Sequence, residues 1–368
     1  MNTSPRTPRR NVHALRQLVA HSILAWLSGR NTHAGSLGYA EPAAAPAWTP
    51  TSPARVPRDQ SAAPETDEHR SRSFTLADAI DVQERLTARD HELIGLLARH
   101  RVLTTQHIAN LLFADDREAS KRLRVLTELG ILERFHHGRS PGHGRGQLPW
   151  HYTLGPLGAM ITAASTETAI PTASDTRARA QRLAHSGGLD HLLGVNDFFA
   201  RLARTARTSS GCALSAWRDS RAAALMCGNH ARPDGYGQWR ERGRGTEFFL
   251  EYDDATNALA VTLSKLRGYR YLAHIGRGLP VLFVFTDPAR RHAFGQGLAN
   301  RPELAAGLLV ATAATGDIHE HGPAAPIWRT GTDTTPQPLI ALAPAPTANP
   351  AAPIESTSRS PRPTSEEL

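Results

Sequence analysis

The feature that most constrains this chain is a hydrophobic period that runs only through its middle, from about residue 77 to residue 340. The flanking residues 31–72 and 341–368 are rich in Ala, Pro, Ser and Thr and carry no such period. Segments of this composition bury too little apolar surface to offset the entropy lost on ordering. We therefore expect residues 1–76 to be a disordered leader with room for one short helix, and residues 341–368 to be a disordered tail.

The periodic region is interrupted once, by a polar stretch at residues 165–176 that we interpret as a linker. A chain of 368 residues is long enough for two domains. We therefore expect one domain over residues 77–164 and a second over residues 177–340. The order of their elements, given below, predicts an α+β or α/β fold class.

The first domain contains three helical patterns, of which the third is the most informative. It covers about residues 116–129 and ends at Gly130, a usual helix terminator. Its apolar side chains share one face. The opposite face carries polar and basic residues, namely Arg117, Ser120, Lys121 and Arg124. A basic, polar outer stripe is what a DNA recognition helix requires.

A strand near residues 131–135 and another near residues 150–153 follow this helix. The long connection between them is rich in Gly and includes Arg139 and Arg145. Three helices followed by such a hairpin are typical of a winged helix-turn-helix. We expect Lys121 and Arg124 to contact bases or phosphates of DNA, and the two wing arginines to neutralise phosphates. The alternative is a winged helix that contacts only proteins, with the charged stripe facing solvent.

Composition agrees with a polyanionic partner, because the formal net charge is +8 and the pI about 10.1. The positive charge is nearly all arginine, since Lys121 and Lys265 are the only lysines. Cys212 and Cys227 lack the spacing of a zinc or redox site. No apolar run reaches the roughly 18 residues of a membrane helix. We therefore expect a cytoplasmic protein with no membrane contact.

The second domain is predicted to have the order α-β-β-β-α-β-α, which is typical of an α/β sandwich. The expected helices cover residues 176–205, residues 256–275 and a segment after Pro288; the expected strands lie near residues 213–218, 232–239, 247–253 and 279–286.

Several motifs together resemble the replication-relaxation family over roughly residues 86–300. They are the runs 91–113, 128–130, 150–152, 154–156, 191–199, 232–235 and 248–253. Members of this family are linked with plasmid replication and plasmid DNA relaxation in high-GC bacteria. The resemblance implies that this chain acts on plasmid DNA, but it supplies no mechanism.

Three carboxylates in the second domain form a candidate metal site. Asp234 lies at the edge of one expected strand, while Glu251 and Asp253 lie two apart on the next strand and so share a face. Clustered carboxylates repel one another unless a cation neutralises them, and oxygen ligands suit Mg²⁺. These residues are therefore candidate Mg²⁺ ligands and catalytic residues for phosphodiester hydrolysis.

The same region is similar to the PD-(D/E)XK nuclease pattern, which implies a restriction-endonuclease-like core with Asp234 and Glu251 as its first two elements. The lysine expected two residues after Glu251 is Asp253 here. Lys265 on the following helix can supply the missing amine, and Asn196 or Asp197 can add a ligand. Two alternatives remain, a nuclease-like domain without catalysis and a different fold in which these residues have ordinary roles.

Two other enzyme classes are disfavoured. A relaxase needs a tyrosine facing a histidine cluster, and no tyrosine of the second domain has a histidine triplet nearby in the sequence. The glycine-rich phosphate loop of an ATP-driven motor is absent as well. We therefore expect a double-stranded-DNA-binding accessory protein for plasmid or mobile-element replication and relaxation, which works with other replication or relaxation proteins. The alternatives are a Mg²⁺-dependent nicking endonuclease and a winged-helix transcriptional regulator.

Overall fold

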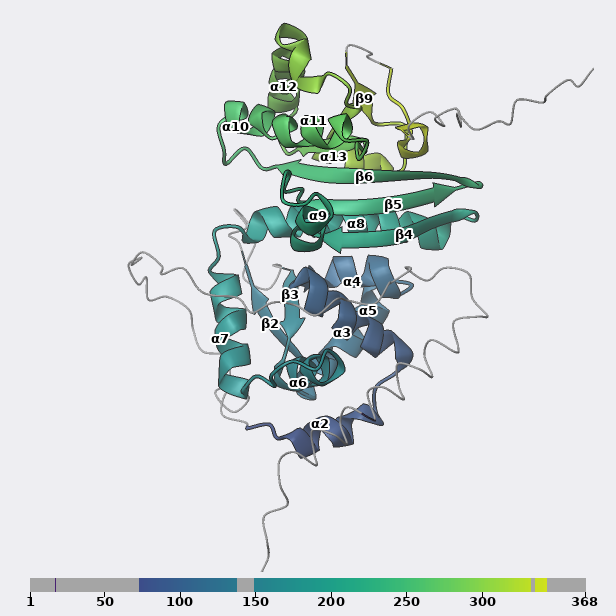
Figure 1. Ribbon diagram of the computed structural model, residues 1–368. Coiled ribbons are helices and arrows are strands. Elements are labelled where there is room, and N and C mark those ends of the chain that lie inside the picture. Colours follow the sequence, from purple (N-terminus) through teal and green to yellow (C-terminus); the bar gives the residue numbers. More distant parts are fainter. Residues whose placement is uncertain (1–16, 18–72, 138–148, 332–334, 343–368) are drawn as a thin grey trace, which may run out of the picture.

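The computed structural model describes residues 17, 73–137, 149–331 and 335–342. The expected leader and tail lie almost wholly outside these residues. The described chain is a mixed α+β structure with one three-stranded and one six-stranded sheet (Figure 1). None of its described helices is long and apolar enough to cross a bilayer.

The N-terminal half, residues 73–184, contains six helices and three strands among the described residues. They are α2 (Leu76–Gln83), α3 (Ala88–His100), β1 (Leu103–Thr104), α4 (Thr105–Leu112), α5 (Asp116–Glu128), β2 (Leu132–His136), β3 (Trp150–Leu154), α6 (Pro156–Ser165) and α7 (Ala173–Ala184). Side chains cap the first turns of α2 to α5, because Thr75, Thr87, Thr104 and Asp115 each accept a hydrogen bond from a backbone N–H three residues on. These local signals fix where the helices begin.

The three strands form an antiparallel sheet in the order β1-β3-β2. Leu103 of β1 pairs with Tyr152, and Phe135 of β2 pairs with His151. The helix expected over residues 116–129 and the two strands expected after it are all present. Arg139 and Arg145, expected between those strands, lie outside the described residues.

The prediction of a single helix over residues 176–205 is wrong, because the structure has two helices there. α7 packs against α6, β2 and β3, and α8 (Leu189–Thr208) starts only after Gly187 and Gly188. Two adjacent glycines each cost about 1 kcal/mol in a helix, which explains the break. The linker expected over residues 165–176 is reduced to the seven residues 166–172 between α6 and α7.

The C-terminal half, residues 189–342, is built on the six-stranded sheet. After α8 its elements are β4 (Cys212–Asp219), α9 (Ser220–Met226), β5 (Gly235–Glu241), β6 (Arg244–Asp253), α10 (Leu259–Ser264), α11 (Leu266–His274), β7 (Val281–Phe285), α12 (Pro288–Asn300), η3 (Pro302–Ala305), β8 (Val310–Ala314), α13 (Thr315–His321), β9 (Arg329–Thr330) and η4 (Leu339–Leu342). The expected order is observed, except that the one helix expected over residues 256–275 is divided into α10 and α11, and that α9 and the elements after α12 are additional. The strand order is β4-β5-β6-β7-β8-β9, in which only β6–β7 and β7–β8 are parallel.

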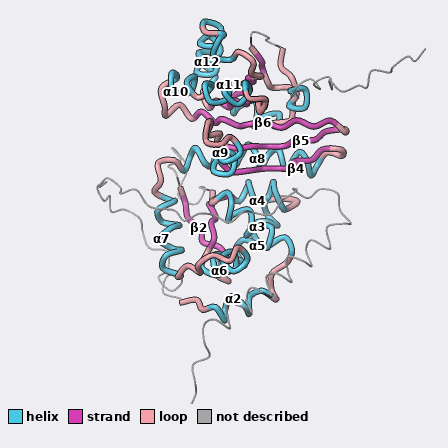
Figure 2. The backbone as a smooth tube through the Cα atoms, viewed as in Figure 1, coloured by secondary structure: helices cyan, strands magenta, loops and turns pink. Residues whose placement is uncertain are grey.

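The six-stranded sheet is covered on both faces, with α8 on one side and α10 to α12 on the other (Figures 1 and 2). Alternate residues of β6 and β7 enter two separate cores. Phe248 and Leu282 pack with α8, whereas Phe249 and Phe283 pack on the other face, where Phe294 of α12 also lies. Burial on both faces explains why β7 is an uninterrupted apolar run.

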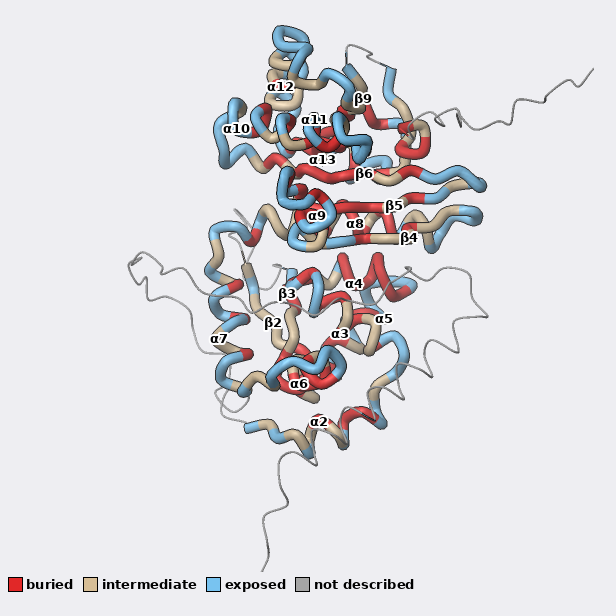
Figure 3. The backbone as a smooth tube through the Cα atoms, in the orientation of Figure 1, coloured by how far each residue is buried: buried red, intermediate tan, exposed pale blue. Residues whose placement is uncertain are grey.

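The two halves share one core, which is why the buried segments of Figure 3 continue from one into the other. α8 lies between them and packs on α4 as well as on β4 and β6. The buried Asn196 amide of α8 donates to the carbonyls of His100, at 3.2 Å, and Val102, at 2.7 Å. His100 in turn stacks on Trp217 of β4 with ring centroids 3.5 Å apart.

Candidate functional site

Strand pairing brings Asp234 and Glu251 to the same end of the sheet. Asp234 precedes β5, and its backbone N–H donates to the carbonyl of Leu250 at 2.9 Å. Its carboxylate accepts the N–H of Tyr252 at 2.8 Å. Glu251 lies between these two positions of β6 and is buried, with 2% of its side chain exposed. The backbone therefore holds both carboxylates in place.

Lys265, at the junction of α10 and α11, joins the two carboxylates. Its Nζ lies 2.5 Å from Oε2 of Glu251 and 4.0 Å from Oδ2 of Asp234. Burial alone would lower the pKa of Lys265, but the two acidic neighbours raise it above the ordinary value. The structure thus brings together three of the four residues expected to be catalytic.

Glu251 is the most perturbed of these groups. Burial, together with the charge of Asp234, raises its pKa from 4.5 to about 8 even though Lys265 and Tyr269 both donate to it. Asp234 differs, because hydrogen bonding to His191 and the charge of Lys265 outweigh burial and hold its pKa below the ordinary value. The pKa values of these two carboxyls, which lie beside the same lysine, are therefore shifted in opposite directions. Such a pair of shifts is common at sites of acid–base chemistry.

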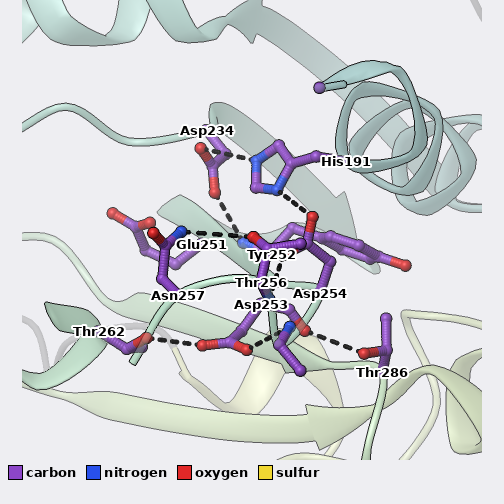
Figure 4. A network of polar contacts seen from close by, with 12 residues as sticks. His191, Asp234, Glu251, Tyr252, Asp253, Asp254, Thr256, Asn257, Thr262 and Thr286 are labelled. Carbon is purple, nitrogen blue, oxygen red and sulfur yellow. Dashed lines mark hydrogen bonds and ion pairs between the residues drawn. The ribbon is translucent and has the colours of Figure 1, made fainter. Parts of the chain in front are cut away.

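His191, in the first turn of α8, completes the cluster and was missed from the sequence (Figure 4). Its Nε2 lies 3.1 Å from Oδ1 of Asp234, and its Nδ1 lies 3.5 Å from Oδ2 of Asp254. Burial would lower the pKa of His191, but these two carboxylates raise it. The imidazole therefore favours its charged form and orients Asp234.

Asp253 lies away from this cluster, contrary to the expectation of a three-carboxylate site. Its carboxylate binds the guanidinium of Arg290 from α12, at 2.5 Å and 3.0 Å, and accepts from the Thr262 hydroxyl at 2.6 Å. Figure 4 shows it directed toward Thr262, on the far side of β6 from His191. Burial would raise its pKa, but Arg290 holds it below the ordinary value. Asp253 thus fastens α12 to the sheet.

Asn196 and Asp197, considered as further ligands, lie apart from this cluster and have other partners. Asp197 contacts His107 of α4 at 3.5 Å, Arg201 at 2.7 Å and His319 at 3.0 Å. Burial would raise the pKa of Asp197, but its interactions with His107 and Arg201 lower it to about 2. This pair therefore serves the contact between the two halves.

The fit to a metal ion is partial. Asp234 and Glu251 supply oxygen ligands of the kind that Mg²⁺ prefers, and they already converge on one cation, the Lys265 ammonium. Among the described residues, no three His, Cys, Asp or Glu side chains are grouped so that they could hold a metal. A bound Mg²⁺ would rest on two carboxylates and would compete with Lys265.

The outer face of α5 is the second candidate surface. Arg117, Ser120, Lys121 and Arg124 are all exposed. Arg122 of the same helix turns inward and binds the buried carboxylate of Asp90 at 2.5 Å, which anchors α5 to α3. Arg124 lies 3.8 Å from Glu128, but both side chains are mostly exposed. The four expected DNA-binding residues of this helix therefore share one accessible face.

A model of one protein family, described as replication-relaxation, matches residues 94–286. The matched segment runs from α3 to the end of β7 and so includes α5, His191 and the Asp234–Glu251–Lys265 cluster. No curated protein and no solved structure matches the chain.

Proposed function

Because the chain belongs to the replication-relaxation family, we propose that it is a DNA-binding accessory protein for the replication and relaxation of a plasmid or other mobile element. Its substrate in this proposal is double-stranded DNA in the cytoplasm, and its partners are other replication or relaxation proteins. The accessible basic face of α5 is the observation that carries the proposal.

In this proposal residues 88–154 act as a winged helix-turn-helix. The order α3-β1-α4-α5-β2-β3 with the sheet order β1-β3-β2 supports this interpretation. α5 is then the recognition helix, and Arg117, Lys121 and Arg124 contact phosphates or base edges in the major groove. Arg139 and Arg145, which lie outside the described residues, add phosphate contacts in this proposal.

A mobility-shift titration at several salt concentrations tests the DNA-binding role. We expect Lys121→Ala and Arg124→Ala each to weaken binding and to reduce the slope of log affinity against log salt by about 1, because each phosphate contact releases about one counterion. Arg301→Ala is the matched control, since Arg301 is exposed and distant from α5 in the chain. Unchanged affinity in both α5 variants would contradict the recognition-helix assignment.

A second candidate function is phosphodiester hydrolysis of the PD-(D/E)XK type, favoured by the convergence of Asp234, Glu251 and Lys265. Asp234 and Glu251 would hold Mg²⁺, which supplies Lewis acidity and an activated water when bound. Lys265, released from Glu251, would donate to a phosphate oxygen. His191 would keep Asp234 ionised and oriented.

Incubation with supercoiled plasmid in Mg²⁺, Mn²⁺ or EDTA separates the two functions, because a gel reports both mobility shift and nicked circles. If the site is active, nicking requires the metal and disappears in an Asp234→Asn, Glu251→Gln double variant. A Glu303→Gln, Glu320→Gln double variant removes two exposed carboxylates and should nick normally. A shift without nicking would leave the DNA-binding role alone.

A further inference from the structure

The tip of the β5–β6 hairpin carries three arginines within five residues, Arg240, Arg242 and Arg244, and all three are exposed. The hairpin reaches beyond its neighbour β7, because β6 pairs with β7 only from Phe249 onward. Figure 3 shows this tip as an exposed projection at one edge of the molecule. This tip belongs neither to the Asp234–Glu251–Lys265 cluster nor to the exposed face of α5.

The turn itself has a defined conformation. Glu241 pairs with Arg244, so the loop has two residues, Arg242 and Gly243, with φ values of 49° and 78°. Positive φ at both positions is typical of a type I′ turn, which matches the twist of a hairpin. Arg242 adopts this strained conformation although glycine or asparagine would do so at lower cost. The turn therefore presents the three arginine side chains from a defined backbone.

None of the three arginines forms an ion pair within the described chain. The two acidic side chains of the hairpin have other partners. Glu241 accepts from the indole of Trp239 at 3.3 Å, and Glu247 accepts from the hydroxyl of Tyr236 at 2.7 Å. The guanidinium groups thus remain free for an external anion.

Beside the hairpin lies a hollow of about 650 Å³. Its lining includes Gln238, Arg240, Arg244, Thr246, Glu247 and Leu279. The two arginines and the glutamine of the lining suit phosphate oxygens, which arginine binds with two parallel hydrogen bonds. Glu247 supplies the single carboxylate of the lining, and it accepts hydrogen bonds from the neutral side chains of Tyr236 and Gln238.

The hairpin tip and the start of α5 belong to different halves of the molecule. A short series of contacts joins them through the end of α8. The N–H of Arg242 donates to the carbonyl of Gly211 at 2.9 Å, just after α8. In the last turn of α8, Arg207 donates to the carbonyl of Phe113 at 3.1 Å, three residues before α5 begins.

We propose that the β5–β6 hairpin is a second DNA contact, in which Arg240, Arg242 and Arg244 bind phosphates of the duplex beside the segment that α5 contacts. This inference rests on the proposed DNA-binding function and extends it to the C-terminal half. Contacts of this kind are independent of sequence, and they lengthen and orient the bound segment.

The test compares two triple variants of the full chain in binding titrations against salt. Arg240→Gln, Arg242→Gln, Arg244→Gln should weaken binding on the order of 100-fold at 0.1 M salt and reduce the salt slope by about 2 to 3. Arg270→Gln, Arg277→Gln, Arg301→Gln removes the same charge from exposed positions of the α11–α12 layer. This control should retain most of the affinity. In the hairpin variant, but not in the control variant, the hydroxyl-radical footprint should be shorter at one end.

Equal losses in the two triple variants would overturn the proposal, because overall charge alone would explain them. Unchanged affinity and footprint in the hairpin variant would also overturn it, and would assign the arginines to another partner, such as an acidic protein. Loss of binding in the α5 variants alone would still support the proposed function. A wild-type chain that binds no DNA would instead refute the proposed function itself. Thermal unfolding of each variant verifies that the fold is intact.

Discussion

Glu251 shows how one buried residue links the candidate site to stability. Its carboxyl is buried between the sheet and α11, where Lys265 and Tyr269 both donate to it. Burial beside Asp234 raises its pKa to about 8. The folded protein therefore holds a proton on this group over a pH range in which the unfolded chain has released it.

We predict that this proton makes unfolding pH-dependent. A folded pKa above the unfolded value stabilises the fold fully below about pH 4.5, and this contribution is lost as pH rises toward about 8. The limiting slope for one proton is about 1.4 kcal/mol per pH unit. Urea unfolding from pH 5 to 8 should show a smaller pH-dependent loss in Glu251→Gln than in wild type, whereas Glu303→Gln should match wild type. Identical curves for Glu251→Gln and wild type would contradict the raised pKa.

At the scale of residues, the sequence predicted that Asp234, Glu251 and Lys265 lie together, but it did not predict that His191 joins them. Asp234, Glu251 and Lys265 were identifiable because adjacent strands and the next helix bring them together. Asp253 lies on the same face of the strand as Glu251, but side chains two residues apart on a strand are separated by about 6 to 7 Å. The two carboxylates therefore bind different cations, Lys265 at Glu251 and Arg290 at Asp253. Neither Arg290 nor His191 is close to these residues in the chain. Their pairing depends on where α12 and α8 dock, which no local pattern reveals.

At the scale of elements, the close approach of α8 to β6 places His191 beside Asp234. Gly194 lies one turn after His191, and a Cβ atom there would come within 2.1 Å of the Tyr252 ring. The helix can lie this close to the strand because residue 194 has no side chain. Tyr252 in turn donates its N–H to Asp234.

We predict opposite effects for two helical glycines. Gly194→Ala should lower the free energy of unfolding by about 1 to 3 kcal/mol, because the added methyl group forces α8 or Tyr252 to move. Gly295→Ala in α12 meets no atom within 4 Å and should stabilise by up to about 1 kcal/mol. Chemical denaturation measures both values. A neutral or stabilising Gly194→Ala would show that α8 does not depend on this close contact.

Elements whose signals are local were predictable from the sequence. Capping residues mark the starts of α3 to α5, strand patterns joined by a glycine-containing turn mark β5 and β6, and an uninterrupted apolar run marks β7. The division of residues 176–205 into α7 and α8 was missed because helical periodicity continues on both sides of Gly187 and Gly188. The role of α7 as part of the N-terminal half follows only from its packing on β2 and β3.

At the scale of the whole molecule, α8 belongs to both halves. Phe198 and Phe199 pack in the core of the six-stranded sheet, and Asn196 holds the backbone between α3 and β1. In the last turns of the helix, Arg204 donates to the side chain of Asn110 in α4, at 3.1 Å. The boundary expected between two domains is therefore a packed interface.

This arrangement predicts one cooperative unfolding transition for residues 73–342. Far-UV circular dichroism and tryptophan fluorescence should give the same midpoint, because most tryptophans of the described chain lie in the C-terminal half whereas helices lie in both. Asn196→Ala should lower both midpoints together, since it removes two buried hydrogen bonds between the halves. Two separate transitions would show that the halves are independent.

The position of α8 also restricts how such a protein can change in evolution. A recombination event that exchanged either half would have to replace the contacts that α8 makes with both halves, and it would expose the core that the halves share. The family match extends from α3 to β7, so it includes all of α8 and parts of both halves. We therefore expect the two halves to be inherited together, so that changes to the exposed face of α5, the DNA contact proposed above, would arise by substitution rather than by exchange of modules.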